Sequence, residues 1–486
     1  MKHGKANEIQ LVITIALKKE LPLTWLRERH IEIHTLQALN SGAMTNGSSE
    51  SRGILILITG PGLSASRESA LWILRNLQPL FVINIGTCGI LNKDLPTGQW
   101  IRPAAVTNSE GKNIALDMRL PIPDPGNIIN ANTLISLEHA CKNEGDGIYD
   151  AADMECHAQA EVFKDMETTF HCLKFGTDYA DNNTDADFKQ NLTLFTNALK
   201  DLLSFLPQDQ YSPAISVVIP VYNREDLVIR ALESVLAQSL TPSEIIVVDD
   251  GSTDNTRSVL QDYTDRITLL HSETNSGASA ARNMGIAHAK TEWIACLDSD
   301  DAWEKDKLKY QTAYLKKYPF YDIIQSDEKW IRNSIRVNPC KHHIKPFGWI
   351  WDVSLLRCVI SPSGVMLRKS LLKQYNGFDE TYPTCEDYDL WIKITRHHPV
   401  GLEPSLSIVK YRGHEDELSG KYSALDSFRS RSLEALLQNE TNPLCRAKII
   451  AILSQKLQIL MSGAEKRNNI EGALGYKKRF TLISQL

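Results

Sequence analysis

The stretch Glu292-Trp-Ile-Ala-Cys-Leu-Asp298-Ser-Asp300-Asp301-Ala-Trp303 decides the fold of the second half of the chain. Its apolar run, Trp293 to Leu297, predicts a buried β-strand, and the acids follow directly. Carboxylates this close repel one another and need a cation, a base or solvent. Ligands of open α/β sheets lie at the carboxyl ends of the strands. The pattern predicts a Mg²⁺ or Mn²⁺ site at Asp298 and Asp300. The alternative is a solvated acidic turn before a helix near Lys305.

The composition indicates a globular protein of more than one domain. The chain has 486 residues, of which 42% are hydrophobic and 23% are charged, and its net charge of -6 comes without a basic stripe. No nucleic-acid partner is therefore expected. The nine cysteines are scattered without a C-x-x-C pair, which favours reduced thiols over a zinc site or disulfides. No apolar run reaches the ~18 residues of a membrane span. We expect a cytoplasmic protein, or one peripheral at the inner face of the membrane.

Two segments upstream of Glu292 predict further strands of the same sheet. Ala214-Ile-Ser-Val-Val-Ile-Pro220-Val precedes the polar Tyr222-Asn223. Glu244-Ile-Ile-Val-Val-Asp249-Asp250-Gly251 holds four consecutive β-formers that cannot alternate in and out. Such a strand is covered on both faces, as central parallel strands are. A helix starting after Asn275-Ser-Gly277 then leads to the acidic stretch.

Together these segments resemble family 2 glycosyltransferases with the GT-A fold. The matching motifs are P-x-Y-N at 220–223, V-V-D-D-G-S-x-D at 247–254, N-x-G-x-x-x-A-R-N at 275–283 and L-D-x-D-D at 297–301. The resemblance implies a GT-A domain over 214–420 and a helical extension over 421–486. It also implies metal-dependent, inverting transfer of a sugar from a UDP- or GDP-sugar to a hydroxyl of a saccharide or lipid-linked acceptor.

The resemblance assigns the donor site to matched positions. The residues expected to line the nucleotide-sugar are Pro220, Tyr222, Asn223, Asp249, Asp250, Gly277, Arg282 and Asp298. Asp298 and Asp300 would hold the divalent ion on the diphosphate, whose charge must be neutralised as the bond breaks. His414 stands where related enzymes place a histidine near the diphosphate, and is a third metal candidate, although an isolated histidine is more often structural.

The acceptor side is expected around Cys385-Glu386-Asp387-Tyr-Asp389. An acceptor hydroxyl must lose its proton as it attacks the anomeric carbon, so a base is needed. The resemblance implies that Asp387 is this base, with Glu386 as the second candidate. The alternative is that both acids only favour the N-terminus of the helix that follows. The helices expected after Ser419 would cap this domain or contact an acceptor or a membrane surface.

The first half repeats the order of strand, glycine turn and helix. Strands are expected at Leu11–Ala16, Gly53–Thr59 and Leu80–Ile85, with glycines following the second and third, and a helix from about Arg67. This recurrence predicts a largely parallel sheet with helices on both faces. A polar segment with two prolines, 207–213, separates the first half from the second and is the expected linker.

The motifs of the first half resemble the purine nucleoside phosphorylase superfamily, and are most similar to its methylthioadenosine/S-adenosylhomocysteine nucleosidases. They are Ala16-Leu17-x-x-Glu20, Gly60-x-Gly62, Asn84-x-Gly86-x-x-Gly89-x-Leu91, Asp153-Met154-Glu155 and Thr177-Asp178-x-Ala180-Asp181. The resemblance implies an α/β/α sandwich over 1–206 that cleaves a purine nucleoside. Asp178 would protonate the base, Glu155 would bind ribose hydroxyls and Glu20 would position the attacking water. Met154, Gly60 and Gly86 would contact the nucleoside.

Two departures from that family leave a second interpretation open. The segment from Gly98 to Asp153, which carries the aromatic clamp on the purine in the family, is short here and contains Pro121-Ile-Pro123-Asp-Pro125-Gly126. His157 stands where the family has a small residue. The first half could instead be a non-catalytic module that forms a homo-oligomer or senses a nucleoside. The motifs do not decide between water and phosphate as the acceptor.

Overall fold

The computed structural model describes residues 9–16, 18–29, 31–40, 53–123, 127–138, 148–180, 184–206, 212–332, 335–337, 344–412 and 424–485. The chain forms two compact units. Unit 1 comprises Met1–Tyr211 with Leu315–Tyr321, and unit 2 comprises Ser212–Tyr314 with Asp322–Leu486. Each unit is built on a nine-stranded sheet with helices, so the predicted α/β class is confirmed for both halves. Leu17, Asp181 and His414, which the sequence analysis singled out, lie outside the described residues.

The sheet of unit 1 has a parallel centre. Its strands are β1 (Leu11–Ile15), β2 (Glu32–Thr35), β3 (Ile54–Ile58), β4 (Phe81–Ile90), β5 (Trp100–Asn108), β6 (Asn113–Ala115), β7 (Ile128–Ser136), β8 (Ala151–Asp153) and β9 (Thr169–Asp178). The order is β2-β3-β1-β4-β8-β7-β5-β6, and β9 pairs with β4 and β5. Strands β2, β3, β1, β4 and β9 run parallel to their neighbours in this series, whereas β8 is antiparallel to β4.

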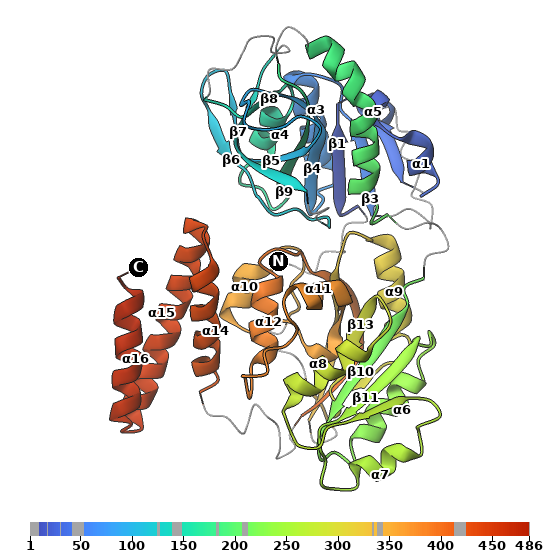
Figure 1. Ribbon diagram of the computed structural model, residues 1–486, viewed down its shortest axis with the longest axis vertical. Helices are drawn as coiled ribbons and strands as arrows, with labels where there is room; N and C mark the ends of the chain where they lie inside the picture. Colours follow the sequence, from blue (N-terminus) through green and yellow to red (C-terminus); the bar gives the residue numbers. More distant parts are fainter. Residues whose placement is uncertain are drawn as a thin grey trace. The chain divides into compact units, whose positions relative to one another are not determined.

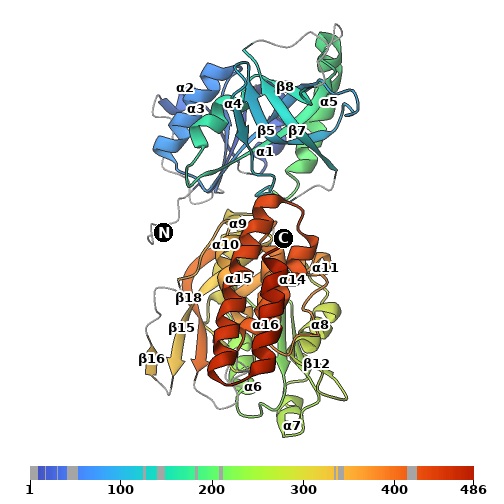
Figure 2. The same cartoon turned by 90° about the vertical axis from the view of Figure 1, so that its left-hand side faces the viewer.

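Helices lie on both faces of the unit 1 sheet, as expected. They are η1 (Lys18–Glu20), α1 (Leu23–Arg27), α2 (Leu36–Asn40), α3 (Leu63–Asn76), α4 (Cys156–Phe163) and α5 (Thr184–Leu202). Figure 2 shows α3 and α4 on one side of the strands and α5 on the other. Apolar side chains of β1, β3 and β4 alternate between the two covered faces, and all are buried. Burial on both faces explains why these strands read as unbroken apolar runs.

Two expected boundaries in unit 1 were wrong. The helix expected from about Arg67 begins at Leu63, directly after Gly62, whose φ of 92° turns the chain out of β3. The strand expected to end before Gly86 continues to Ile90. Its glycines lie inside the strand, and at Gly89 the neighbouring chain approaches closely: a Cβ there would stand 3.1 Å from Oδ1 of Asp178, the last residue of β9, and 2.9 Å from the Cβ of Ala180 just beyond it. Close approach of a neighbouring chain is a use of glycine that mimics a turn signal in sequence.

The sheet of unit 2 (Figure 1) combines a parallel half with a half in which parallel and antiparallel pairs are mixed. Its strands are β10 (Ile215–Val221), β11 (Glu244–Asp249), β12 (Thr268–His271), β13 (Trp293–Cys296), β14 (Ala302–Trp303), β15 (Ile323–Arg332), β16 (Ile335–Val337), β17 (Val365–Arg368) and β18 (Gly401–Arg412). The order is β12-β11-β10-β13-β17-β15-β18-β14, with β16 on β15. Strand β11 lies between β10 and β12 and is parallel to both, which confirms that it is a central strand.

The helices of unit 2 follow the expected pattern. They are α6 (Val228–Leu236), α7 (Thr256–Gln261), α8 (Ala278–His288), α9 (Lys307–Lys317), α10 (Trp351–Leu356), α11 (Lys369–Gln374), α12 (Glu386–Ile394), α14 (Asp426–Asn439), α15 (Pro443–Lys466) and α16 (Ile470–Ile483). Helix α8 packs tightly on the sheet, since a Cβ at Gly285 would stand 2.5 Å from Val218. Helix α16 packs against α15, and α15 against α14, as Figure 2 shows. Among the described residues no helix is long and apolar enough to cross a bilayer.

Candidate functional site

Unit 2 brings the predicted donor residues to one edge of its sheet. Strands β10, β11 and β13 are parallel, and Val221 pairs with Asp249 while Val218 pairs with Cys296. Tyr222 and Asn223 follow β10, Asp249 ends β11, and Asp298 comes two residues after β13. The run from Trp293 to Leu297 is fully buried, so the acids begin where the chain leaves the core. This is the edge at which open α/β sheets bind ligands.

Hydrogen bonds join the loops after β10 and β11. Asp249 is buried, and its carboxylate accepts from the amide of Ser252 at 3.0 Å and lies 3.1 Å from Nδ1 of His271. Asn223 has φ of 48°, and its side-chain oxygen accepts from the amide of Thr253 at 2.8 Å. Left-handed backbone at a non-glycine residue is strained and marks many functional sites. Tyr222 remains more than a third exposed beside these loops.

Asp250 and Gly277 are joined to each other. The Asp250 carboxylate accepts from the amide of Ser276 at 3.0 Å and from the amide of Gly277 at 2.7 Å. It thereby occupies amide groups just before α8, where an anion is favoured by the helix N-terminus. This arrangement requires glycine at position 251, because a Cβ there would clash with the Thr274 carbonyl carbon at 2.8 Å. Asp250 thus positions the loop before α8, and its predicted contact with the donor stays a prediction.

Arg282 links the two predicted acid motifs. Its Nη2 donates to Asp298 Oδ1 at 2.8 Å, and its Nη1 donates to Glu386 Oε1 at 2.7 Å. The guanidinium side chain is only 6% exposed. Burial would raise the pKa of Asp298, but the charge of Arg282 and then that of Lys410 hold it below its usual value. Motifs that are almost ninety residues apart in sequence therefore lie on either side of one buried cation.

The acids after β13 have different surroundings. Asp301 is buried, accepts from Ser363 Oγ at 2.6 Å and lies 3.6 Å from Lys410 Nζ. Burial raises the pKa of Asp301 to about 7, against the effect of Lys410. Asp298 and Asp300 are half-buried, and Arg230 donates to the Asp300 carbonyl at 2.6 Å. The sequence did not separate Asp301 from its neighbours, although Asp301 belongs to the core.

The donor set at Asp298 and Asp300 fits a hard divalent ion. Mg²⁺ and Mn²⁺ take one or two carboxylates and fill their other positions with phosphate oxygens and water. Within the part of the chain that the structure describes, no group of three or more His, Cys, Asp or Glu is placed to hold a metal ion, so phosphate oxygens and water would have to supply the remaining positions. When bound with a nucleotide diphosphate, the ion would neutralise the charge of the leaving group. Arg282 would hold Asp298 Oδ1 in place beside it.

Glu386 and Asp387 stand in unlike environments at the start of α12. Glu386 is buried and engaged by Arg282, and burial raises its pKa above the usual range, although Arg282 opposes this. Asp387 is half-buried, and the thiol of Cys358 donates to its Oδ2 at 3.2 Å. Cys385, which precedes the pair, has φ of 63°. The less buried acid is the better candidate for contact with an acceptor.

Cys358 lies beside the candidate base Asp387. Sequence reasoning did not identify this cysteine. Burial and the adjacent Asp387 raise the pKa of its thiol well above the usual range, so the sulfur keeps its proton and remains a donor. A second contact, from Sγ to the Ile360 carbonyl at 3.2 Å, directs it. Twenty-nine residues separate Cys358 from Asp387. No local pattern in the sequence relates them.

The three predicted acids of unit 1 are all buried. Glu20 accepts from Thr87 Oγ1 at 3.2 Å, Glu155 lies 3.4 Å from the amide of Gly62, and Asp178 accepts from the amide of Ala180 at 2.9 Å. Glu20 follows β1, Thr87 is in β4 and Asp178 ends β9, and these three strands are adjacent and parallel. Burial raises the pKa of Glu155, and the negative charge of Glu20 acts in the same direction. The acids thus gather at one edge of the sheet.

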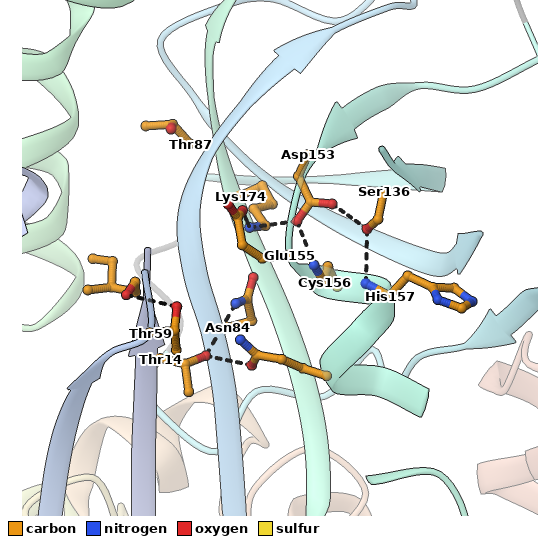
Figure 3. Close-up of polar contacts among 12 residues, drawn as sticks. Thr14, Thr59, Asn84, Thr87, Ser136, Asp153, Glu155, Cys156, His157 and Lys174 are labelled. Atoms are coloured by element: carbon orange, nitrogen blue, oxygen red, sulfur yellow. Dashed lines mark hydrogen bonds and ion pairs between the residues drawn. The ribbon is translucent and has the colours of Figure 1, made fainter. Parts of the chain in front are cut away.

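A buried lysine lies behind Glu155 (Figure 3). Lys174 is 1% exposed, and its Nζ stands 2.8 Å from Asp153 Oδ2 and 3.6 Å from Glu155 Oε2. Burial would lower the pKa of Lys174, but Asp153 and then Glu155 hold it well above the usual range. For Glu155 burial is the larger influence, and it raises the pKa while Lys174 lowers it. Sequence reasoning missed Lys174, although a lysine inside the apolar strand Cys172-Leu-Lys-Phe was an available signal.

Asp153 organises the segment between β8 and α4. It accepts from the amide of Cys156 at 2.9 Å and from Ser136 Oγ, which in turn accepts from the amide of His157 at 2.9 Å. Figure 3 shows this chain of contacts. The ring of His157 is buried with Nε2 3.0 Å from the Lys112 carbonyl. His157, the departure noted in the sequence, therefore fills a structural position. Met154 is half-buried, Gly60 follows β3 by two residues, and Gly86 lies inside β4.

Unit 2 is therefore an α/β unit with acid motifs at the carboxyl ends of its parallel strands, the edge at which sheets of this kind bind ligands. A family model described as Glycosyl transferase family 2 matches residues 216–374. The chain is also 32% identical to the Escherichia coli protein named UDP-Glc:alpha-D-GlcNAc-diphosphoundecaprenol beta-1,3-glucosyltransferase WfgD, over 48% of this chain and 88% of WfgD. The chain belongs to glycosyl transferase family 2. Two longer rickettsial relatives, 35% and 31% identical, are matched over 37% and 33% of their own lengths.

Solved structures similar to the chain fall into two groups. One is Staphylococcus aureus TarS in complex with UDP-GlcNAc, with a TM-score of 0.46 and 23% identity over 55% of this chain and 81% of that one. The other includes the 5'-methylthioadenosine/S-adenosylhomocysteine nucleosidase of Neisseria meningitidis, with a TM-score of 0.33 and 17% identity over 40% of this chain and 97% of that one. Both groups are those that the motifs of the two halves resemble.

Proposed function

We propose that unit 2 transfers a sugar from a nucleotide-sugar to an acceptor hydroxyl, with Mg²⁺ or Mn²⁺ held by Asp298 and Asp300. The observation that carries this proposal is the bridge from Arg282 to Asp298 and Glu386. It holds the donor-side acids beside the pair Glu386-Asp387. Asp387 then accepts the proton of the acceptor hydroxyl, which increases the nucleophilicity of that oxygen as the diphosphate leaves.

The donor and acceptor that we propose are inferred from a relative that this chain covers over most of its length. WfgD is named for UDP-glucose as donor and for a diphosphoundecaprenol-linked acceptor, and this chain covers 88% of it. We infer a UDP-sugar donor and a lipid-linked saccharide acceptor for this chain. We therefore also propose that the protein is cytoplasmic and peripheral at the inner face of the membrane, where it would meet an acceptor of that kind.

The test is a panel of UDP- and GDP-sugars with and without Mn²⁺, scored for binding, hydrolysis and transfer. Hydrolysis or transfer should be lost after chelation and restored by Mn²⁺. Asp300→Asn is the variant chosen, because a change at Asp298 would also remove its ion pair with Arg282. Losing one ligand should raise the Mn²⁺ concentration for half-maximal activity at least ~10-fold. Asp306→Asn, another acid shortly after the motif, should leave the Mn²⁺ requirement unchanged. Metal-independent turnover of every donor would refute the metal proposal.

We further infer that unit 1 cleaves a purine nucleoside. The supporting observation is that Glu20, Glu155 and Asp178 are all present at one edge of the sheet and are held by hydrogen bonds. Fixed carboxylates around a cationic, oxocarbenium-like transition state stabilise its charge. The competing interpretation is a module that forms a homo-oligomer or binds a nucleoside without reaction.

Adenine release from methylthioadenosine and S-adenosylhomocysteine, with and without phosphate, separates these interpretations. Asp178→Asn should lower release about 10²-fold, since the base then leaves without its proton. Thr177→Ser keeps the hydroxyl that donates to Asp178 and should retain activity. If the wild-type protein binds these nucleosides without releasing adenine, unit 1 is a binding module. A mass that doubles with concentration would identify an oligomer.

A further inference from the structure

The C-terminal helices of unit 2 differ in charge from the rest of the chain. Residues 441–485 contain eight Lys and Arg but only two Asp and Glu, a local net charge of +6, whereas the whole chain carries -6. The basic residues are concentrated on α15 and α16. Such an asymmetry within one chain indicates an anionic partner for the basic part.

Several of these cations are free to meet such a partner. Arg446, Lys456 and Arg479 are engaged in contacts within the helical layer. Lys466, Arg467, Lys477 and Lys478 are exposed and form no ion pair with any residue that the structure describes. The exposed acids of the same segment are Glu465 and Glu471, so the four exposed cations outnumber them. The exposed surface therefore stays positive.

Helix α16 also presents apolar side chains to solvent. Ile470, Leu474 and Leu482 recur at a spacing of four or eight residues, with Lys478 completing the series, so the four lie along one stripe of the helix. The opposite stripe, with Ala473 and Ile483, is buried. A helix that packs its apolar residues only inward would have polar residues on this stripe.

Helix α15 also exposes two apolar side chains. Leu444 and Ile459 project from it, while Ile449, Leu453, Leu457 and Leu460 are buried. Together the outward apolar residues of the two helices, Leu444, Ile459, Ile470, Leu474 and Leu482, are between 55% and 77% exposed. Figures 1 and 2 agree that α16 lies on the outer side of the helical layer of unit 2. We call the outward surface of these two helices the α15–α16 face.

We propose that the α15–α16 face docks on an anionic lipid bilayer. Exposed leucine and isoleucine next to lysine is the composition of helices that lie in a membrane interface: the apolar groups enter the acyl boundary and the lysines meet anionic headgroups. A second copy of this chain is a poorer occupant. A two-fold interface sets the same patch against itself, so Lys477 and Lys478 would meet like charges.

This inference deepens the proposed function. It rests on that function in one respect: a lipid-linked acceptor would lie in the bilayer on which the α15–α16 face docks. Docking would keep unit 2 at the bilayer without a spanning helix. The surface and its charge are observations that hold whichever donor the unit uses. The experiment can therefore separate a failure of docking from a failure of sugar transfer.

The test is co-sedimentation of the full chain with vesicles of phosphatidylcholine, with or without phosphatidylglycerol. We expect binding to the anionic vesicles only, weakened by salt because the headgroup attraction is screened. Lys477→Glu with Lys478→Glu, and separately Leu474→Ser with Leu482→Ser, should each weaken binding at least ~10-fold, since each exposed cation and each buried leucine contributes to interfacial affinity. Equal binding to both vesicle types, or none, would overturn the proposal.

Matched controls keep the result interpretable. Lys373→Glu on α11 and Ile335→Ser on β16 change exposed residues of the same types elsewhere in unit 2 and should not alter vesicle binding. Unchanged thermal unfolding of the double variants shows that they fold. Hydrolysis of the donor without vesicles should also be unchanged in them. A different result would assign the face to a second copy of the chain. In that case the wild-type protein would not bind vesicles but would dimerise with increasing concentration, and Leu474→Ser with Leu482→Ser would abolish the dimer.

Discussion

Asp387→Asn is expected to lower sugar transfer between about 10² and 10⁴-fold, the range for loss of a general base. An amide accepts hydrogen bonds but cannot take the proton of an acceptor hydroxyl at neutral pH. Binding of the nucleotide-sugar should persist, because Arg282 pairs with Glu386 and Asp298 rather than with Asp387. The measurement is transfer to the acceptor beside direct titration of the donor. A loss confined to donor affinity would exclude Asp387 as the base.

A control on the same helix tests the purely structural interpretation of this acid. Asp389 also lies in the first turn of α12 and forms an ion pair with Lys393. Acids in a first turn stabilise a helix by about 0.3–1 kcal/mol. If Asp387 had only this role, Asp387→Asn and Asp389→Asn would both lower the free energy of unfolding, Asp389→Asn by more because its ion pair is also lost, and both would leave transfer intact. We expect transfer to separate the two variants.

Lys174→Met is expected to destabilise unit 1 by about 3–5 kcal/mol, the usual cost of removing one partner from a buried ion pair. The substitution leaves Asp153, whose side chain is wholly buried, and Glu155 without their cation. Lys174→Arg keeps the charge and should cost less. Chemical denaturation gives the free energy, and hydrogen exchange over β4 and β9 assigns the loss to unit 1. Exchange rates like those of the wild type would exclude this role for Lys174.

The loss in free energy of unfolding caused by Lys174→Met should also depend on pH. Burial already raises the pKa of Glu155, and without Lys174 the influence that lowers it is gone. A carboxyl whose folded-state pKa lies above its unfolded value stabilises the fold at low pH, and this stability is lost as pH rises through the unfolded and then the folded pKa. The variant should therefore recover toward the wild type as pH falls to about 4. A deficit independent of pH would indicate lost packing instead.

Much of unit 2 could be predicted because its signals are local. An apolar run such as Trp293 to Leu297 has to be buried on both faces, and the acids after it have to leave the core. Glycine was harder to interpret, since the same residue serves turns and close contacts. Gly62, with φ of 92°, caps α3 after the turn that follows β3, whereas Gly89 lies inside β4, where a Cβ would stand only 3.1 Å from Asp178 of β9. Only the position of the neighbouring strand distinguishes the two.

By itself, the sequence determined the α/β class of both halves, the family of the second half and the candidate acids, because hydrophobic runs and short motifs are properties of neighbouring residues. Tertiary structure decided what each acid contacts. Arg282 between Asp298 and Glu386, Cys358 beside Asp387, and Lys174 behind Glu155 all join segments that are far apart in the chain or on different strands. A buried charge requires a partner, but which residue supplies it depends on how distant segments pack.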